Sequence, residues 1–217
     1  MKKIIAVNCS PRVNMNTADL VRCAAEGARI AGAEVEVVDL YRLGKFTGCI
    51  SCFGCKLEPN KGKCICRDGL AELLEKIRTA DGVILGSPNY LGDLTAGFRA
   101  LFERLVYQHI TYRREAMCNN DRLIPTLLIV TSNADNESYE GDGMNAAMLA
   151  RYETQLSRYL GKTRTLIYGA TQQVPDYSRF DWNTAIPEER RKRKEEVLPI
   201  LRQQAQALGA QMAQGEW

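Results

Sequence analysis

Short apolar runs alternate with longer amphipathic stretches along this 217-residue chain. The runs are rich in β-branched residues and predict strands, whereas apolar residues at helical spacing predict helices between them. The predicted strands lie within residues 3–8, 33–40, 81–90, 123–133 and 162–170, the third ending at Gly86. The predicted helices cover residues 17–32, 68–80 with Asp68 in the cap, 95–108, 143–161 and 187–212.

This alternation constrains the fold strongly. Parallel strands joined through helices need right-handed crossovers, which place helices on both faces of the sheet. We therefore expect an α/β fold, a three-layer doubly wound parallel sheet of five strands. No linker or low-complexity stretch divides the chain. We expect one domain over residues 1–217, with a cysteine-rich insertion at 48–67 and a C-terminal tail plus helix at 170–217.

The composition narrows the class of protein. With 45% hydrophobic and 25% charged residues, the chain is typical of globular proteins in water. The apolar run that follows Met1 ends too early for a signal peptide or a membrane span, so we expect a cytoplasmic protein without a membrane partner. The net charge is only +3, and the basic run at 188–196 is interleaved with glutamates at helical spacing. We therefore expect no nucleic-acid partner.

Three polar loops follow predicted strands and are candidates for ligand binding. They span residues 9–17, 87–93 and 131–143. In doubly wound folds, ligands bind outside the carboxyl ends of the strands, near the point where the strand order reverses. These loops are therefore the expected edge of a binding site.

The first loop, CSPRVNMNT, has the chemistry of a phosphate site. Its donors are Ser10, Asn14, Asn16 and Thr17, beside the cationic fork of Arg12, and the loop leads directly into a helix N-terminus. The chain lacks both G-x-x-x-x-G-K-[ST] and G-x-G-x-x-G, so a single monophosphate is favoured over ATP or a dinucleotide. The alternative is that these side chains only cap the helix. Without the glycine fingerprint, Asp39 after the second strand is interpreted as a loop residue.

At this point the residues carry a family resemblance. The segments SPRVNMNT (10–17) and SPNYLGDLTAGFRALFER (87–104) resemble the phosphate loop and the flavin-ring loop of the flavodoxin-like NADPH-dependent FMN reductases. The segment VPDYSRFDW (174–182) resembles a C-terminal segment of the same group. The cysteine segment resembles the compact motif of the iron–sulfur flavoproteins in that superfamily. The resemblance implies a flavodoxin-like fold and FMN.

The resemblance also implies roles for individual residues. The FMN phosphate would be held by Ser10, Arg12, Asn16 and Thr17. The isoalloxazine ring would be wrapped by Pro88, Asn89, Tyr90, Leu91 and Gly92. Cys9 and Met15 stand where glycines are common in the family.

The ring loop suits a flavin on its own chemistry, because a proline stiffens it and its backbone amides can reach the polar edge of a flat heterocycle. The cofactor carries the redox chemistry, so we expect no catalytic acid or base. The one histidine, His109, is expected to be structural or solvent-facing. After the fourth strand, Ser132, Asn133 and Asp135 are either further flavin contacts or an ordinary surface loop.

The chain has 8 cysteines, most of them in one segment. Cys49, Cys52 and Cys55 follow the pattern C-x-x-C-x-x-C, and Cys64 and Cys66 come shortly after. In a reducing compartment, clustered cysteines are more often metal ligands or redox groups than disulfides. The close spacing and the lack of a nearby histidine favour a [4Fe–4S] cluster over zinc. The scattered Cys9, Cys23 and Cys118 need no function.

The resemblance implies the same cluster, with Cys49, Cys52, Cys55 and Cys64 as ligands and Cys66 as a competing fourth ligand. Reduced or redox-active thiols without a cluster, or a zinc site, remain open. Because the segment follows the second strand, we expect it at the same carboxyl edge of the sheet as the flavin loops. A cluster there could exchange single electrons with FMN.

Together these features predict an FMN-dependent oxidoreductase. Electrons would pass from NAD(P)H, or from a protein donor, through FMN to a quinone, a flavin or another small-molecule acceptor. The alternative is an iron–sulfur flavoprotein that carries electrons from a ferredoxin-like donor. A ligand-binding or zinc-stabilised interaction module is the third possibility.

The tail between the last strand and the last helix, residues 171–187, is long for a simple connection. Its aromatic residues Tyr177, Phe180 and Trp182 could pack on a neighbouring subunit or on their own core. We expect a homodimer or a homotetramer.

Overall fold

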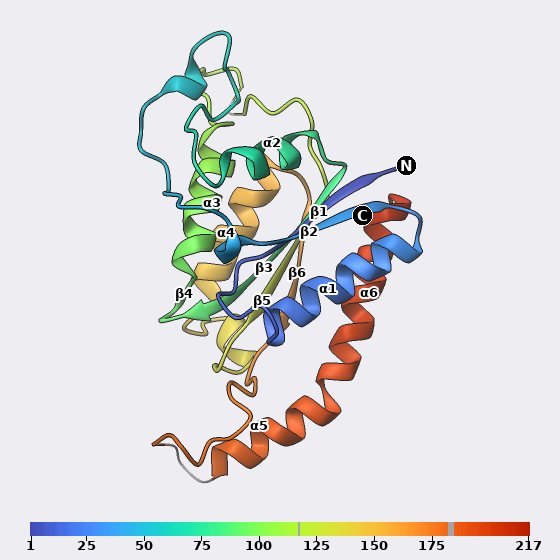
Figure 1. The fold of residues 1–217 in the computed structure, drawn as a ribbon. Helices are drawn as coiled ribbons and strands as arrows, with labels where there is room; N and C mark the ends of the chain where they lie inside the picture. Colours follow the sequence, from blue (N-terminus) through green and yellow to red (C-terminus); the bar gives the residue numbers. More distant parts are fainter. Residues whose placement is uncertain (117, 182–184) are drawn as a thin grey trace.

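The computed structural model describes residues 1–116, 118–181 and 185–217. Its centre is a parallel sheet with the strand order β2-β1-β3-β5-β6 (Figure 1). These strands are β1 (Lys3–Asn8), β2 (Glu34–Asp39), β3 (Gly82–Tyr90), β5 (Thr126–Thr131) and β6 (Thr163–Tyr168). The order reverses between β1 and β3, as it does in flavodoxin-like folds. The predicted doubly wound sheet is confirmed.

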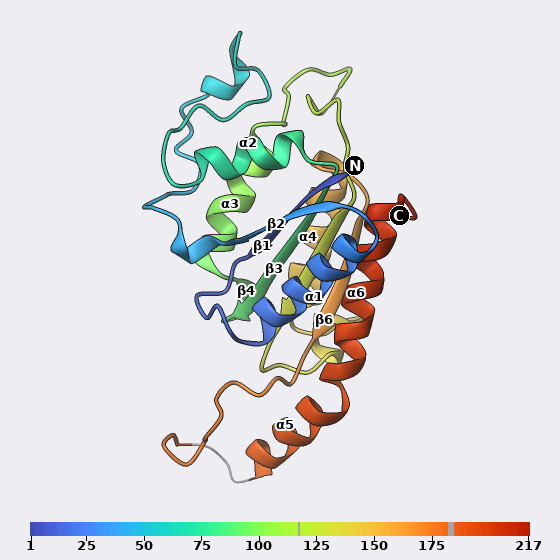
Figure 2. The ribbon, with the colours of Figure 1, turned by 45° about the vertical axis from the view of Figure 1, so that its right-hand side comes forward.

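Helices cover both faces of this sheet (Figures 1 and 2). One face carries α1 (Asn16–Ile30) and α6 (Leu198–Gln214), and the other carries α2 (Ala71–Thr79), α3 (Ala96–Tyr107) and α4 (Ala146–Tyr159). Successive side chains of a strand point to opposite faces. Accordingly, Ile4 and Ala6 pack with α1 and α6, while Ile5 and Val7 pack with the other three helices. Nearly continuous apolar strands are the sequence signature of such a two-sided sheet.

The contact between α1 and α6 depends on two glycines. A Cβ on Gly209 would lie 1.9 Å from the backbone oxygen of Ala24, and one on Gly27 would lie 2.0 Å from that of Gln206. At each of these two positions, glycine has only a hydrogen atom in place of a side chain, so the backbone of the other helix can lie against it. This close approach fixes the spacing of the outer layer.

The third strand is longer than predicted. It continues past Gly86 because Ser87 and Pro88 pair with β5, and Asn89 and Tyr90 pair with the short antiparallel β4 (Asp93–Leu94). The turn between β3 and β4 is formed by Leu91 and Gly92, both with positive φ. A hairpin turn with two such residues matches the twist of its strands. The predicted ring loop is therefore largely a strand and its hairpin.

Two helix predictions need correction. Asp68 does not cap α2, which begins at Ala71 with Leu70 as its N-cap residue. The carboxylate of Asp68 instead binds Arg104 and accepts the N–H of Leu70. The last helix is divided at Val197 into α5 (Ala185–Glu196) and α6. Pro199 has no N–H and its ring crowds the preceding turn, which kinks or breaks a helix at this point.

Helix α5 extends beyond the sheet (Figure 1). Two of its arginines hold it to the body: Arg193 Nε donates to the oxygen of Gly169 at 2.8 Å, and Arg190 donates to that of Asn133 at 3.1 Å. The basic run thus both faces solvent and docks the helix. No described helix is long and apolar enough to cross a membrane.

Candidate functional site

A pocket lies where the strand order reverses, between the loops that follow β1, β3 and β5. Many of the residues predicted from the sequence line it, namely Ser10, Arg12, Asn16, Thr17, Pro88, Asn89, Tyr90, Ser132 and Asn133. The space between them has an empty volume of about 340 Å³, part of it open to solvent. Side chains from segments far apart in the sequence therefore converge on one concave surface.

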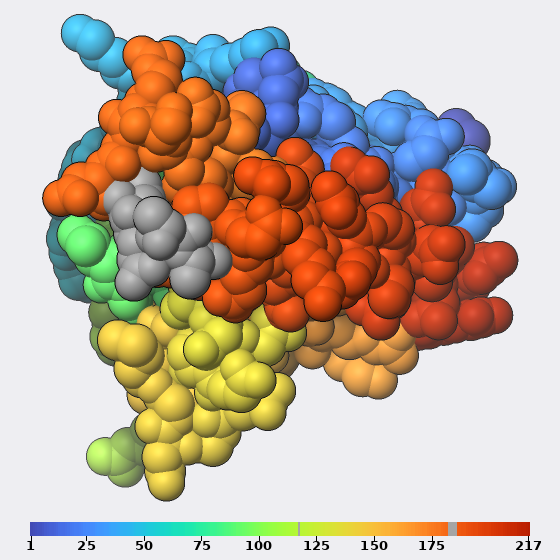
Figure 3. Space-filling model, turned by 90° about the horizontal axis from the view of Figure 1, so that it is seen from below, coloured from blue at the N-terminus to red at the C-terminus, as the bar shows by residue number. Residues whose placement is uncertain are grey.

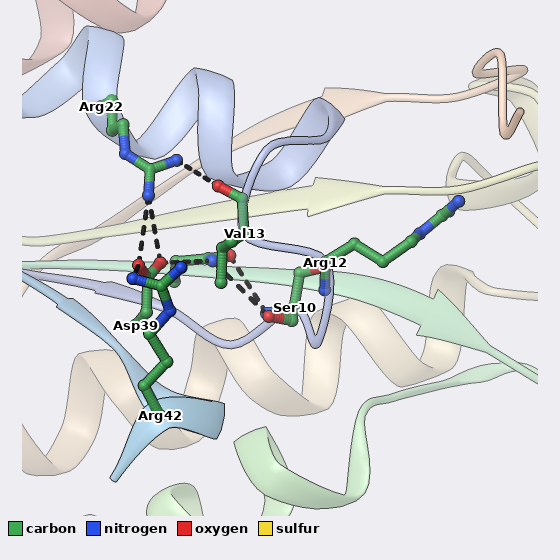
Figure 4. Close-up of polar contacts among 7 residues, drawn as sticks. Ser10, Arg12, Val13, Arg22, Asp39 and Arg42 are labelled. Carbon is green, nitrogen blue, oxygen red and sulfur yellow. Dashed lines mark hydrogen bonds and ion pairs between the residues drawn. The ribbon is translucent and has the colours of Figure 1, made fainter. Parts of the chain in front are cut away.

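The loop after β1 is held from within (Figure 4). The N–H of Ser10 donates to Asn8 Oδ1 at 3.1 Å, and the N–H of Arg12 donates to Ser10 Oγ at 3.1 Å. Arg22 donates to the oxygen of Val13. These bonds turn the loop tightly between the end of β1 and the start of α1.

Asp39 supports this loop from the neighbouring strand. It accepts hydrogen bonds from Asn8 Nδ2 at 2.8 Å and from Arg22 Nη2 at 3.2 Å, and Arg42 lies 4.0 Å away (Figure 4). Asp39 does not line the pocket. Asp39 is the last residue of β2, so its interpretation as a loop residue is wrong, whereas its place outside the pocket agrees with the prediction that it is no ribose contact.

The N-terminus of α1 faces the same region without a side-chain cap. Its N-cap residue is Met15, in an extended conformation, and no side chain accepts a hydrogen bond at that position. The first bond of the helix runs from the N–H of Asp19 to the oxygen of Met15 at 3.0 Å. The alternative that the polar loop residues merely cap the helix is therefore wrong. Uncapped N–H groups at a helix N-terminus attract anions.

Two hydroxyls lie beside this uncapped turn. Thr17 Oγ1 and Thr131 Oγ1 are 2.7 Å apart, and both residues are buried. One hydroxyl of such a pair always has a hydrogen to spare for a third partner. The pair therefore adds a buried donor to the backbone N–H groups.

The C-terminal tail closes the pocket. Arg12 donates to the oxygen of Gln173, and Asn16 Nδ2 donates to that of Gln172 at 2.8 Å. The N–H of Gln173 donates to the hydroxyl of Tyr177, which is buried. Seen from below, the tail, α5 and the loop after β5 form much of this face (Figure 3).

Several pocket residues were not predicted from the sequence: Met15, Thr131, Thr171 and Gln173. Met15 and Thr131 adjoin predicted residues, whereas the two tail residues reach the pocket only through the fold. The tail's resemblance to a family segment was the available signal. Of the aromatic residues predicted there, Tyr177 is buried, Phe180 is 52% exposed and Trp182 lies outside the described residues.

Three predicted residues do not line the pocket: Asn14, Leu91 and Gly92. Asn14 faces a neighbouring cavity, and the other two form the tip of the hairpin, with Leu91 fully exposed. Asp135 is also absent from the lining and accepts the N–H of Ser138 at 3.0 Å.

The hairpin beside the pocket is fixed at both ends. Asn89 Nδ2 donates to the hydroxyl of Tyr139 at 2.8 Å and to Asn145 Oδ1 at 3.0 Å. Asp93 accepts from Tyr152 and pairs with Arg99 at 2.9 Å. Burial opposes ionisation of Asp93, but these partners keep the pKa of its carboxyl below the ordinary value. The hairpin is therefore a rigid wall of the pocket.

A second cavity contains the cysteine cluster. Its lining includes Cys49, Cys52, Cys55, Cys64 and Cys66, all as free thiols. The segment is fastened to the C-terminal half of α3: the N–H of Cys49 donates to Glu103 at 3.2 Å, and that of Cys64 to Gln108 at 3.1 Å. The five cysteines of the segment thus line one cavity.

The position of this cavity differs from the sequence expectation. The segment leaves the carboxyl edge of the sheet after β2, but it runs along α3 to the helix's other end (Figure 1). Thr95, at the start of α3, bonds to the loop after β1. Arg104 lies nine residues further on, which is about 14 Å along a helix. The cysteines therefore do not share the edge of the flavin loops.

A buried arginine forms one wall of the cysteine cavity. The Arg104 side chain is 1% exposed, and its Nη1 lies 2.6 Å and 2.7 Å from the two carboxylate oxygens of Asp68. Its Nη2 donates to the oxygen of Cys66 at 2.8 Å, while its Nε has no acceptor. Sequence reasoning missed this residue because it lies beside the apolar stripe of Phe98, Leu101 and Leu105.

The thiols are not arranged around a single point. Among the described residues, no three His, Cys, Asp or Glu side chains are close enough to bind one metal ion. Burial raises the pKa of the Cys55 thiol, and the neighbouring Cys64 and Cys49 add to this effect. Burial also raises the pKa of Cys66, helped by Asp68.

Two further titratable side chains, Cys9 and His109, line neither the pocket at the strand-order reversal nor the cysteine cavity. Cys9 is fully buried, and burial raises the pKa of its thiol. His109 is 5% exposed; burial, with Lys56 and Arg78 nearby, lowers its pKa to about 4. The expectation that this histidine is structural agrees with its place in the core.

The strand order and the pocket at its reversal define a flavodoxin-like protein with a ligand site that suits a phosphorylated compound. The sequence model of the NADPH-dependent FMN reductase family matches residues 2–132. The chain belongs to this family, which confirms the resemblance read from its loops.

Similar proteins include two iron–sulfur flavoproteins. That of Methanocaldococcus jannaschii is 40% identical over 102 residues, which cover 47% of this chain and 51% of the relative. That of Archaeoglobus fulgidus is 30% identical over 158 residues, 71% of each chain. The chain therefore aligns with about half the length of the first and over two thirds of the second.

Solved structures of similar fold share little sequence with this chain. The NAD(P)H:quinone oxidoreductase from Methanothermobacter marburgensis has a TM-score of 0.66 at 19% identity, covering 97% of this chain and 96% of its own. An azoreductase from Bacillus anthracis has a TM-score of 0.66 at 15% identity, covering 97% and 100%. At these identities the likeness establishes the fold.

Proposed function

We propose that this protein is an FMN-dependent oxidoreductase that takes electrons from NAD(P)H, or from a protein donor, and passes them to a quinone, a flavin or another small acceptor. The observation that carries the proposal is the pocket at the strand-order reversal, with an uncapped helix N-terminus and two buried threonines at its base. Membership of the FMN reductase family supports the choice of ligand.

The phosphate end of the pocket would use donors that have no acceptor of their own. The first N–H groups of α1 point toward it, and Ser10 and Thr17 supply hydroxyls. Arg12 lies at the rim and adds a positive charge that a dianionic phosphate favours. Fixed dipoles of this kind bind an anion without first having to reorganise.

The ring end would lie against the hairpin, where Pro88, Asn89 and Tyr90 line the pocket. FMN, when bound, supplies the two-electron chemistry. The bonds from Asn89 to Tyr139 and Asn145 hold the hairpin's backbone in one position. The chain's contribution is then to orient the ligand and to exclude water, and no catalytic acid or base is assigned.

The experiment compares FMN with riboflavin, which lacks the phosphate. Full-length protein, reconstituted with each ligand, is titrated by flavin fluorescence, and NADH and NADPH oxidation is followed with a quinone acceptor. We expect FMN to bind at least tenfold more tightly than riboflavin, because hydrogen bonds to charged groups contribute about 1.5–3 kcal/mol each. Protein that binds neither flavin would refute the proposal.

A second candidate function is an iron–sulfur flavoprotein that carries electrons from a ferredoxin-like donor. Five thiols line one cavity beside a buried arginine with one free N–H, which supports this candidate. As they stand, no three of the described side chains are close enough to hold one metal ion, so the thiols would have to move together to bind a cluster. The names of the similar proteins favour the same reading. Cys49, Cys52, Cys55 and Cys64 would hold a [4Fe–4S] cluster.

Anaerobic absorption spectra, with iron and sulfide analysis of the reconstituted protein, test this second function. Stoichiometric iron and a broad visible shoulder beyond the flavin bands are expected. Flavin bands without iron would leave the first proposal standing and remove the second.

We also propose that residues 1–217 act as one domain, that the protein works in the cytoplasm, where its thiols stay reduced, and that it forms a homodimer or homotetramer. The exposed Phe180 on the tail supports the last point. Light scattering tests it, and a monomer would refute it.

A further inference from the structure

A further cavity lies near the start of β3 and β5, at the amino ends of the strands. Its lining residues come from residues 59–63, the end of α2, His109 after α3 and the loop before β5. Its empty volume is about 880 Å³, part of it open to solvent. Among the described residues, none lines both this cavity and either the pocket at the strand-order reversal or the cysteine cavity. The cavity is therefore separate from both proposed redox sites.

Positive charge dominates this cavity. Its cationic lining residues are Lys61, Lys63, Arg78 and Arg122. Of the described residues that line it, only Asp121 carries a carboxylate. Glu75 pairs with Lys63 and Arg78, and Asp81 pairs with Arg122, but neither acid lines the cavity. Cations gathered around a concave surface raise the local concentration of anions.

His109 also lines this cavity, and its buried Nδ1 has no hydrogen-bond partner. Gln108 determines which ring nitrogen carries the proton. Gln108 Oε1 accepts the N–H of Cys64 at 3.1 Å, and Gln108 Nε2 lies 3.2 Å from His109 Nε2. An amide nitrogen only donates, so His109 Nε2 accepts and the proton of the neutral imidazole is on Nδ1.

This Nδ1–H is a donor that lacks an acceptor. His109 is 5% exposed, and buried donors are rarely left without a partner. Burial, with the positive charges of Lys56 and Arg78 nearby, lowers the pKa of the imidazole, which keeps the ring neutral. The same positive charges favour an acceptor that is negative. An anion in the cavity would satisfy both the N–H and the surrounding cations.

We propose that this cavity binds the phosphate group of a small molecule or inorganic phosphate, with the Nδ1–H of His109 donating to one of its oxygens and the lining lysines and arginines balancing its charge. Phosphate suits the site better than a carboxylate, because it has up to two negative charges and several acceptor oxygens for the separate donors. The site does not depend on the proposed redox function, since it shares no lining residue with the flavin pocket among those described.

The first test uses the one histidine of the chain, whose imidazole signals report on this cavity alone. Full-length protein with ¹⁵N-labelled histidine, incubated with FMN, is studied by long-range ¹H–¹⁵N NMR at about pH 7.5, where phosphate is mostly dianionic. We expect the proton on Nδ1, and saturable shifts of the imidazole signals when inorganic phosphate is added. Sodium acetate at equal ionic strength, the control, should leave these signals almost unchanged.

An imidazole protonated on Nε2 would overturn the proposal. So would signals that phosphate does not move, or that acetate moves equally. If the protein binds no FMN, the proposed redox function fails, and the imidazole signals still decide whether this cavity binds phosphate. The same titration with glycerol phosphate distinguishes the two sources of the ligand: tighter binding of glycerol phosphate indicates a phosphate monoester, and tighter binding of inorganic phosphate indicates the free ion.

The second test removes charge from the cavity at exposed positions, where the fold should tolerate it. In the double variant Lys61→Met/Lys63→Met, both side chains are exposed lining residues. The Kd for phosphate, taken from the imidazole shifts, should rise about tenfold, because two charge-assisted contacts are lost. Lys192→Met, an exposed position on α5 that does not line the cavity, is the matched control and should keep the wild-type Kd. An unchanged Kd in the double variant would refute the site.

Discussion

At the scale of single residues, the first turn of α1 supplies most of the hydrogen-bond donors of the proposed phosphate site. Its N-cap residue, Met15, has no polar side chain, and the nearest hydroxyl is that of Thr17, paired with Thr131. The turn has no side-chain cap from its own sequence. A ligand that supplies oxygen atoms would satisfy both the backbone and the buried hydroxyl.

Thr17→Val removes this hydroxyl and keeps the shape of the side chain. The Kd for FMN should rise at least tenfold, since a hydrogen bond to a charged group contributes about 1.5–3 kcal/mol, whereas the Kd for riboflavin should stay unchanged. Fluorescence titration with both ligands measures this difference. Asn14→Ala, in the neighbouring cavity, is the control. An equal loss for both ligands would show that the substitution acts on the fold.

The polar character of a loop in the sequence was not enough to predict which of its residues line the pocket. Ser10 and Thr17 could be predicted because they follow a recognisable strand. Asn14 belongs to the same run but turns to another cavity. Thr171 and Gln173 come from a tail about 150 residues further on. Arg104 takes its role from a partner in another element, which no spacing rule contains.

At the scale of elements, the three inner strands, β1, β3 and β5, could be predicted because each is an apolar run covered on both faces. Their ends could not, since β3 continues only where β5 and β4 offer pairing partners. From the sequence, Asp68 is expected to cap the helix that follows it, but in the structure its carboxylate accepts hydrogen bonds from Arg104 instead. Pro199 is a signal for the break of the last helix, because a proline is tolerated in the first turn of a helix but not in its interior, and the single predicted helix missed it.

The packing of α1 against α6 gives a prediction at this scale. Gly209→Ala should destabilise the protein by about 2 kcal/mol or more, because overpacking at a backbone contact exceeds the gain of about 1 kcal/mol in helix propensity. Urea unfolding measures the change. Gly44→Ala, whose Cβ would meet nothing within 4 Å, should leave the midpoint almost unchanged. If both variants had the same midpoint, the close approach of the two helices would be in doubt.

At the scale of the whole molecule, the two cavities lie at opposite ends of α3. The loop after β1, which forms part of the pocket, contacts the start of this helix through the bond from Thr95 to the oxygen of Cys9, and the cysteine cavity lies at its last turns. One rigid helix therefore sets the separation between the proposed flavin and cluster sites. This arrangement follows from the path of residues 48–67, which the sequence analysis expected at the carboxyl edge of the sheet and which instead reaches the last turns of α3.

His109 makes the stability of the whole molecule depend on pH in a definite window. Burial lowers its pKa to about 4, against about 6.5 in an unfolded chain. The unfolded state therefore binds the extra proton first, and the stabilisation present above pH 6.5 is lost as the pH falls toward 4. The free energy of unfolding should drop by about 2 kcal/mol between pH 7 and pH 5. His109→Gln should remove most of this pH dependence, because the chain has one histidine. The carboxyl groups of Asp68, Glu75 and Asp93 have lowered pKa values, so their protonation changes the stability only at lower pH. Urea unfolding of both proteins at several pH values measures it, and a wild-type profile that is flat from pH 7 to 5 would contradict the burial of a neutral imidazole.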